Sequence, residues 1–329
     1  MAERVTILGG GSMGTACGWV LAHNGCAVSL VPREPDRAAA INAARRNERH
    51  LPDAQLPPSM TAAPACGPCE VLLVAVPSRH LRPALKAAAA RVEPGVPVVS
   101  VVKGIEAGTL ARPSEIIEEE LGPRPVVVLG GPSHAEEIVA RQPTSVVAAG
   151  SDAAIAERVQ AMFTSDRFRV YTNGDPLGVE LAGALKNVIG LAAGICDGVG
   201  YGDNAKAALL TRAISEMRRF GAALGARPET FAGLAGVGDL ITTCVSPHGR
   251  NRAVGERLGR GETLDQILAG AASEAEGVST ARGVRELAGR YGVDMPIVDE
   301  ACAVLFEGKS PAAATDSLMT RPPRDESPR

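Results

Sequence analysis

The feature that most constrains the fold lies at the start of the sequence, where a short apolar run at residues 4–8 leads into a glycine-rich turn. Gly9, Gly11 and Gly14 follow the pattern GxGxxG, and a helical pattern begins at residue 15. The first glycine allows a tight turn, the second lets the backbone approach a pyrophosphate, and the third lets the helix pack closely on the strand. Because the helix N-terminus also supplies free N–H groups, this unit predicts a dinucleotide-binding site. The alternative is an ordinary glycine turn of an α/β protein.

Apolar runs typical of buried strands alternate with helical patterns over the first half of the chain. The runs lie at residues 4–8, 27–31, 71–76, 97–102, 126–129 and 145–148. This alternation predicts an α/β fold in which a mostly parallel sheet has helices on both faces, a Rossmann-like domain over residues 1–176.

The pattern changes after about residue 175. Alanine- and leucine-rich helical segments follow at residues 177–196, 204–224, 251–259 and 280–290. They predict an all-helical domain over residues 177–310. We expect residues 311–329 to form a disordered tail, because residues 320–329 show no apolar periodicity.

Composition excludes several classes of protein. The net charge is −3 and aromatic residues make up 3% of the chain, so neither a basic nucleic-acid surface nor base-stacking platforms are expected. An uninterrupted apolar run of about 18 residues, which a membrane span needs, is missing. The N-terminal residues lack the apolar core of a secretory signal, and we therefore expect a cytoplasmic protein.

The seven cysteines are an odd number and lack the regular spacing of a disulfide framework, so reduced thiols are expected. Cys66 and Cys69 form a CxxC motif, which occurs in redox pairs and in zinc sites. A redox pair normally follows a strand, whereas this motif precedes the run 71–76, and a second pair for zinc is missing. We therefore expect a turn with two unreactive cysteines, and no metal site.

The cofactor preference depends on the end of the second predicted strand. An acidic residue there binds the ribose 2′-hydroxyl of NAD, whereas an arginine accommodates the 2′-phosphate of NADP. Arg33 lies where this residue is expected, and Glu34 follows it. NADP(H) is therefore favoured and NAD(H) stays possible. The alternative is a pair of solvated surface charges.

Lys186 and Asn187 are polar residues in the middle of a segment, residues 179–195, that is apolar on nearly all sides. Such a helix is expected to be buried. Burial lowers the pKa of a lysine towards neutrality, which suits a proton-transfer group. The alternatives are a lysine that extends to the surface and a structural ion pair.

Polar residues also follow two of the predicted strands. Lys103 comes after the run 97–102, at a carboxyl end, where open parallel sheets bind their ligands. Ser133 and Glu136 follow the run 126–129 with the spacing of a capping box, which predicts a helix N-terminus at the same sheet edge.

A third set of polar residues lies in the second half of the chain. A glycine-dense stretch ends at Asp239, and Arg250 and Asn251 follow soon after. The planar guanidinium of an arginine suits a phosphate group. Taken singly, each of these residues is as well explained by a turn or a surface ion pair.

Together these segments resemble the NAD(P)-dependent glycerol-3-phosphate dehydrogenases, especially the bacterial type. The resemblance extends from Gly9 to about Glu307. It rests on GGGSMGTA (9–16), KGI (103–105), GPSHAEE (131–137), GVELAGALKNVI (178–189), DGVGYGDNAKAAL (197–209), GLAGVGDLITTC (233–244) and HGRNR (248–252). It implies reversible reduction of dihydroxyacetone phosphate to sn-glycerol 3-phosphate, which supplies the glycerophospholipid backbone. It also implies a phosphorylated small-molecule substrate and a homo-oligomer, a dimer.

The resemblance assigns roles to individual residues. Lys186 is implied as the proton donor and acceptor, with its pKa lowered by Lys103 and Arg250 and raised by Asp239. The implied substrate-binding residues are Lys103, Gly131, Ser133, Lys186, Asp239, Arg250 and Asn251. The implied cofactor-binding residues are Gly9, Gly11, Ser12, Met13, Gly14, Arg33, Lys103, Ala135, Arg250 and Glu276. Asn187 and Thr243 lie in matching motifs with weaker claims.

Two positions depart from the family pattern. Met13 stands where an aromatic residue is common, and Gly249 stands where a serine is common, so a stacking ring and a hydroxyl contact to substrate are missing. A ketopantoate-type or β-hydroxyacid reductase is a rival interpretation, since it combines the same two kinds of domain with a buried lysine. The basic residues around Arg250 favour a phosphorylated substrate instead. A non-catalytic dinucleotide sensor is a further alternative, but it needs no proton-transfer group such as Lys186.

Overall fold

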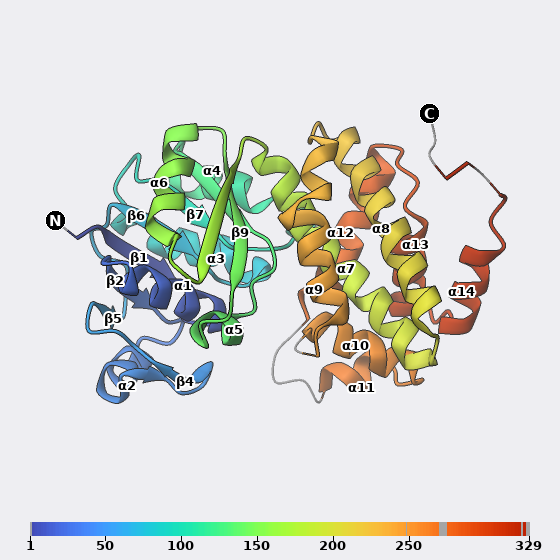
Figure 1. The fold of residues 1–329 in the computed structure, drawn as a ribbon, viewed down its shortest axis with the longest axis horizontal. Coiled ribbons are helices and arrows are strands. Elements are labelled where there is room, and N and C mark those ends of the chain that lie inside the picture. The colour runs from blue at the N-terminus through green and yellow to red at the C-terminus, as the bar shows by residue number, and fades with distance from the viewer. Residues whose placement is uncertain (1, 248, 270–274, 324, 327–329) are drawn as a thin grey trace.

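The chain folds into an α/β half followed by a helical half, as the computed structural model in Figure 1 shows. The structure describes residues 2–247, 249–269, 275–323 and 325–326. The predicted fold class, a Rossmann-like, mostly parallel sheet followed by helices, is confirmed.

The α/β half is organised around one eight-stranded sheet with the order β10-β9-β8-β7-β6-β1-β2-β5. Its strands are β1 (Arg4–Leu8), β2 (Ala27–Val31), β5 (Met60–Ala62), β6 (Val71–Val74), β7 (Val98–Ser100), β8 (Val126–Gly130), β9 (Thr144–Gly150) and β10 (Phe168–Asn173). Neighbouring strands are parallel except for the antiparallel pair β8 and β9. A separate antiparallel hairpin is formed by β3 (Arg46–Asn47) and β4 (Leu51–Gln55).

Helices cover both faces of this sheet. They are α1 (Ser12–His23), α2 (Asp36–Ala44), α3 (Leu81–Ala88), α4 (Pro113–Leu121), α5 (Ala135–Val139) and α6 (Ala153–Phe163). Neighbouring residues of one strand belong to different apolar clusters: Leu73 packs with Ile7 in one cluster, and Val74 packs with Leu8 in the other. Burial on both faces explains why the central strands are apolar at every position.

The helical half is built around one long buried helix, α7 (Pro176–Val199). The others are α8 (Asp203–Ala223), α9 (Asp239–Val245), α10 (Arg250–Gly259), α11 (Leu264–Ala269), α12 (Glu276–Arg290), α13 (Pro296–Phe306) and α14 (Pro311–Met319). Glycines let α7 and α10 approach closely, since a Cβ at Gly194 or Gly255 would lie 2.0 Å from a backbone oxygen of the other helix. In the described residues α7 alone is long and apolar enough to cross a membrane, but 94% of that stretch is buried inside the protein, as in a core helix.

The prediction of a disordered tail over residues 311–329 is wrong for its first part. Residues 311–319 form α14, which packs against α13 and α7. The helix begins where Ser310 accepts a hydrogen bond from the N–H of Ala313, with Pro311 at its first position. Arg321 then forms an ion pair with Asp294 at 2.7 Å. Residues 324 and 327–329 lie outside the described residues.

A buried carboxyl group links α8 to α13. Glu216 is 2% exposed, and its Oε1 accepts a hydrogen bond from the N–H of Ile297 at 2.9 Å. Its Oε2 has no hydrogen-bond partner among the described residues. Burial raises the pKa of Glu216 from 4.5 to about 7, and the hydrogen bonds at the start of α13 offset only part of this shift.

We therefore expect Glu216→Gln to stabilise the protein more at pH 8 than at pH 4.5. A carboxyl group with a raised pKa in the folded state costs stability as the pH rises from 4.5 to about 7, and a glutamine has no such cost. The difference in unfolding free energy between the variant and the wild type should therefore grow by about 3 kcal/mol from pH 4.5 to pH 8. Urea unfolding at both pH values measures it, with Glu157→Gln at an exposed position of α6 as the control. The same difference in unfolding free energy between variant and wild type at both pH values would contradict this prediction.

Candidate functional site

The predicted polar residues meet between the carboxyl edge of the sheet and the helices α7 and α9. Lys103 follows β7, Gly131 follows β8, Lys186 lies in the middle of α7, and Asp239 begins α9. A narrow pocket at this edge is lined by Met13 of the glycine-rich turn together with Lys103 and Ser133. The fold therefore brings the glycine turn, the two lysines and the carboxylate into one region.

The centre of the site is one carboxylate shared by two lysines. Asp239 accepts a hydrogen bond from Nζ of Lys186 at 2.5 Å through Oδ1 and from Nζ of Lys103 at 2.6 Å through Oδ2. Lys186 also donates to Oγ1 of Thr243 at 2.9 Å, and Lys103 donates to the carbonyl of Gly131 at 3.3 Å. Each ammonium group is therefore held in a fixed position.

Burial controls the charge at this centre. Lys186 is 8% exposed, and burial lowers its pKa to about 8, with Asp239 opposing this shift and Lys103 adding to it. Burial alone would raise the pKa of Asp239, but Lys103 and Lys186 hold it below its usual value. An amine that titrates near neutrality beside a permanent carboxylate can both give and take a proton.

A chain of amide hydrogen bonds lies behind the lysines. Asn187 donates from Nδ2 to the carbonyl of Lys103 at 3.2 Å, and Asn251 donates to Oδ1 of Asn187 at 2.9 Å. The N–H of Gly277 donates to Oδ1 of Asn251 at 2.9 Å. These bonds connect the end of β7 with α7, α10 and α12, and both asparagines are buried.

The glycine-rich turn has the geometry that a pyrophosphate requires. Gly9 has φ +118°, and a Cβ there would lie 2.7 Å from the carbonyl carbon of Ala75. A Cβ at Gly14 would lie 2.0 Å from the carbonyl oxygen of Gly9, whereas nothing lies within 4 Å of a Cβ at Gly11. The N-terminus of α1 has no side-chain cap. Open space above Gly11 and uncapped N–H groups together suit an anionic group of a dinucleotide.

The predicted capping box at Ser133 is wrong. His134 is the N-cap residue of α5, its side chain does not cap the helix, and Ala135 is buried in the first turn. Ser133 lies one residue too early to cap, and its Oγ donates to the carbonyl of Gly131 at 2.9 Å. The expected helix N-terminus is nevertheless present at this sheet edge.

Four other predicted residues lie on or next to other elements. Arg250 is exposed in the first turn of α10, and Arg33 is exposed just after β2. Glu276 begins α12 and accepts a hydrogen bond from the N–H of Ser78 at 3.1 Å. Ser12 is half-buried at the start of α1 and donates to the carbonyl of His50 at 3.1 Å.

The structure explains one of the two departures from the family pattern. Gly249 is buried, and a Cβ at this position would lie 2.8 Å from the carbonyl oxygen of Thr243. This backbone therefore leaves no room for a side chain there. Met13 is half-buried and packs against the apolar cluster under α1. His248, part of one resembling motif, lies outside the described residues.

Sequence reasoning missed the hairpin β3–β4 and its contacts with the glycine turn. Asn47 is completely buried and donates from Nδ2 to the carbonyl of Gly10 at 2.9 Å and to Oγ1 of Thr15 at 2.8 Å. The hairpin is short and mostly polar, so no periodic pattern marks it. A lone asparagine carries no signal of burial.

The cysteine motif lies away from this centre. Cys66 and Cys69 are buried free thiols in the apolar cluster under α3. Burial raises the pKa of Cys66 to about 11 and that of Cys69 above its usual value. Thiols with raised pKa values are poor nucleophiles, in agreement with the expected unreactive cysteines, although residues 66–69 form a loop segment rather than a turn.

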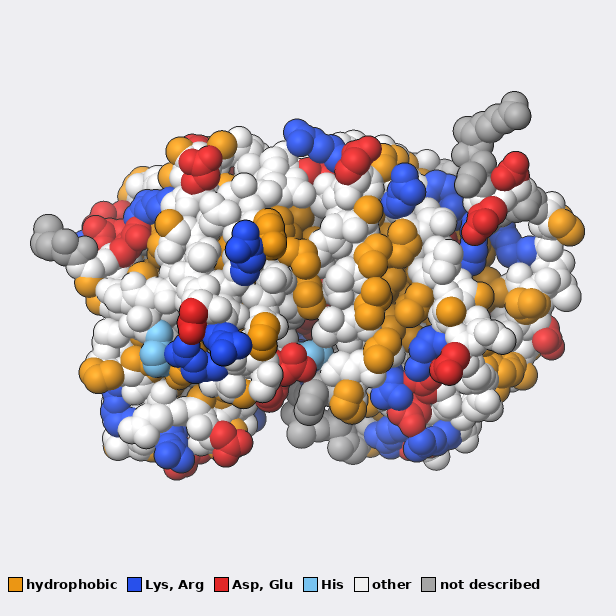
Figure 2. Space-filling view, in the orientation of Figure 1, with side chains coloured by type: hydrophobic (Ala, Val, Ile, Leu, Met, Phe, Trp, Pro, Cys, Tyr) orange, Lys and Arg blue, Asp and Glu red, His pale blue; other side chains and the backbone are white. Residues whose placement is uncertain are grey.

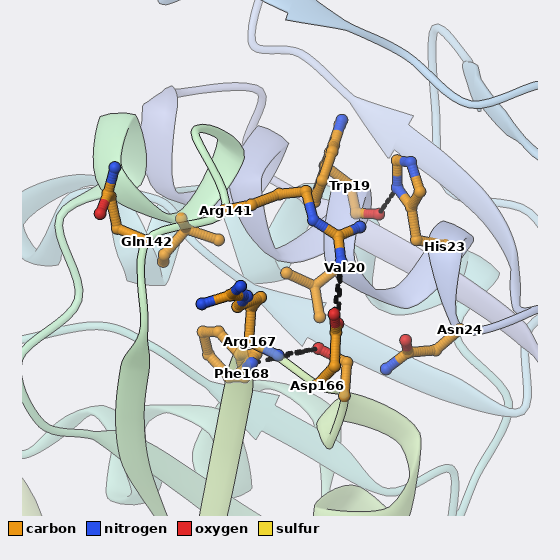
Figure 3. Close-up of a pocket in the computed structure, with 11 residues that line it drawn as sticks. Trp19, Val20, His23, Asn24, Arg141, Gln142, Asp166, Arg167 and Phe168 are labelled. Atoms are coloured by element: carbon orange, nitrogen blue, oxygen red, sulfur yellow. Dashed lines mark hydrogen bonds and ion pairs between the residues drawn. The ribbon is translucent and has the colours of Figure 1, made fainter.

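A surface pocket of about 160 Å³ lies elsewhere on the sheet domain, between α1, the end of α5 and the loop before β10 (Figure 3). Arg141 and Asp166 form an ion pair at its rim, at 2.7 Å. None of the predicted site residues lines it. Figure 2 shows that acidic and basic side chains are mixed over this face of the molecule, without a continuous basic surface.

Comparisons with known proteins agree with this geometry. Residues 4–156 match the family model described as NAD-dependent glycerol-3-phosphate dehydrogenase N-terminus, and residues 175–316 match the C-terminus model. Glycerol-3-phosphate dehydrogenase [NAD(P)+] of Geobacillus thermodenitrificans is 48% identical, over 98% of this chain and 96% of that protein. The Salinibacter ruber protein of the same name, numbered 2, is 46% identical over 99% and 97%.

Solved structures show the same likeness. A crystal structure of glycerol-3-phosphate dehydrogenase from Coxiella burnetii has a TM-score of 0.91 at 33% identity and covers 97% of this chain and 99% of that one. A ketopantoate reductase from Ralstonia eutropha has a TM-score of 0.61 at 16% identity, over 96% and 99%. The second likeness is one of fold alone.

Proposed function

The chain belongs to the NAD-dependent glycerol-3-phosphate dehydrogenase family, and we propose that it catalyses the reversible reduction of dihydroxyacetone phosphate to sn-glycerol 3-phosphate with NAD(P)H. The observation that carries this proposal is a buried lysine, Lys186, paired with Asp239 at the carboxyl edge of the sheet. The product would supply the backbone of glycerophospholipids.

The cofactor, when bound, supplies the hydride for C2 of the ketone. Lys186 holds a proton on Nζ and gives it to the oxygen on C2 as that oxygen becomes an alkoxide. In the reverse direction neutral Lys186 takes the proton of the C2 hydroxyl. Asp239 and Thr243 position the amine through their hydrogen bonds, and Lys103 adds positive charge beside the developing oxyanion.

The remaining residues bind the two ligands in this proposal. The substrate-binding residues are Lys103, Gly131, Ser133, Asp239, Arg250 and Asn251. The cofactor-binding residues are Gly9, Gly11, Ser12, Met13, Gly14, Arg33, Lys103, Ala135, Arg250 and Glu276. Arg250, exposed in the first turn of α10, suits the substrate phosphate because a guanidinium forms paired hydrogen bonds with phosphate oxygens.

Oxidation of NADPH and NADH with different ketones tests the function. We expect turnover with dihydroxyacetone phosphate and none with 2-dehydropantoate, the unphosphorylated, carboxylated substrate of the rival enzyme class. The reverse preference would favour that rival. Cofactor binding without turnover of either ketone would favour a sensor.

The two directions of the reaction should have opposite pH dependences. Reduction needs protonated Lys186, so its kcat/KM should fall about tenfold per pH unit above a pKa of about 8. Oxidation needs the neutral amine, so its kcat/KM should rise up to the same pKa and then level off. Steady-state rates from pH 6 to 10, measured in both directions, give these two dependences of kcat/KM on pH. Parallel profiles would contradict the assignment of Lys186.

We further propose a cytoplasmic homodimer. Leu209, Leu210 and Ile214 on α8 are only partly buried within one chain and would be covered by a second copy. The free state of all seven cysteines supports a reducing compartment. Light scattering on the purified protein tests the dimer, and Leu210→Asp should shift it towards the monomer.

A further inference from the structure

The hairpin β3–β4 packs beside the glycine-rich turn and is hydrogen-bonded to it. Asn47 ties it to the carbonyl of Gly10, and the hydroxyl of Ser12 donates to the carbonyl of His50. Asn47 is completely buried, so the hairpin is fixed to the turn rather than loosely placed. Side chains at the tip of the hairpin are therefore held near the end of β2.

This anchoring puts a second arginine beside the residues that follow β2. Nη1 of Arg49 lies 3.7 Å from Oε2 of Glu34, and Nη2 of Arg33 lies 3.1 Å from Oε1 of the same carboxylate. The side chains of Arg33, Arg49 and Glu34 are 75%, 59% and 44% exposed. Two accessible guanidinium groups thus share one accessible carboxylate.

The end of β2 is the place where a dinucleotide-binding domain contacts the 2′ position of the adenosine ribose. A 2′-phosphate is a multivalent anion that arginine binds through paired hydrogen bonds, and it would replace Glu34 as the partner of both guanidinium groups. A 2′-hydroxyl group can instead donate a hydrogen bond to the carboxylate of Glu34. The two arginines therefore suit NADP(H), and Glu34 suits NAD(H).

We infer that Arg49 is a second ligand of the NADP(H) 2′-phosphate, and that Glu34 competes with this phosphate for both arginines while it favours NAD(H). This inference rests on the proposed function, because it concerns the cofactor site of that enzyme. Arg49 is nevertheless a residue of the hairpin, outside the strand end that carries Arg33.

Direct binding tests this assignment without turnover. Dissociation constants for NADPH and NADH are measured by nicotinamide fluorescence in the wild type, Arg49→Ala, Glu34→Ala and Arg46→Ala. Loss of one charge-assisted hydrogen bond from Arg49 should weaken NADPH binding about tenfold and NADH binding much less. Glu34→Ala should change the preference in the opposite direction, towards NADPH.

Arg46 is the matched control, since it is exposed on the same hairpin and, among the described residues, the ion pairs of Glu34 are with Arg33 and Arg49 instead. Its alanine variant should leave both dissociation constants unchanged. Calorimetry with 2′,5′-ADP and 5′-AMP isolates the 2′-phosphate, and only the first should lose affinity in Arg49→Ala. Thermal melting checks that each variant is folded.

Equal losses for NADPH and NADH in folded Arg49→Ala would overturn the assignment, as would equal losses for 2′,5′-ADP and 5′-AMP. Failure of the proposed function has a different signature, since wild-type protein would then not reduce dihydroxyacetone phosphate with either cofactor. A wild type that is active, with an unchanged cofactor preference in Arg49→Ala, rejects the role of Arg49 alone.

Discussion

Replacing Lys186 by alanine should lower kcat for dihydroxyacetone phosphate reduction by about 10²- to 10⁴-fold, the usual contribution of a general acid. The affinity for NADPH should change little, because the amine touches Asp239 and Thr243 rather than the glycine-rich turn. The fold should survive, since Asp239 keeps its hydrogen bond from Lys103. Steady-state rates and cofactor fluorescence titration measure the two quantities separately.

Two further variants make this result specific. Lys186→Met fills the volume of the lysine without an amine and should lose as much activity as the alanine variant. Lys86→Met changes an exposed lysine of α3 and should leave kcat unchanged. Turnover within a few-fold of the wild type in Lys186→Met would remove Lys186 from the chemistry.

Strands buried on both faces are readily predicted, whereas half-exposed ones are not. In β6 all residues are buried, so the run is apolar throughout and visible in the sequence. In β10 buried Phe168 and Val170 alternate with exposed Arg169 and Tyr171, and the strand was not predicted. Its short alternation is a weak signal beside the continuous runs.

The site could be predicted residue by residue but not as a geometry. A lysine in an apolar segment makes Lys186 a candidate for a desolvated amine, and the resemblance to the family implies its role in proton transfer. Its partner Asp239 is 53 positions away along the chain, and no local pattern pairs them. Asn47 was missed for the same reason, because its burial depends on a turn formed by residues 37 positions earlier.

Asp239→Asn should have the second large effect, on both stability and pH dependence. The carboxylate raises the pKa of Lys186, and without it burial and the neighbouring Lys103 lower that pKa further below about 8. A smaller fraction of Lys186 would then be protonated at pH 7, so protonation of the alkoxide would be slower. Two buried or partly buried ammonium groups would also lose their shared partner, which should cost about 3–5 kcal/mol of unfolding free energy.

The pH profile separates this electrostatic role from simple loss of stability. The alkaline limb of kcat/KM for reduction should move to lower pH in Asp239→Asn. Asp197 provides the matched control, because it also lies between two cations, Lys206 and Arg252, at the far end of α7. Asp197→Asn should lose stability, whereas the alkaline fall of its kcat/KM for reduction should stay near pH 8. If the alkaline fall of Asp239→Asn also stays near pH 8, Asp239 does not control the pKa of Lys186. Its contribution would then be limited to holding the amine in position.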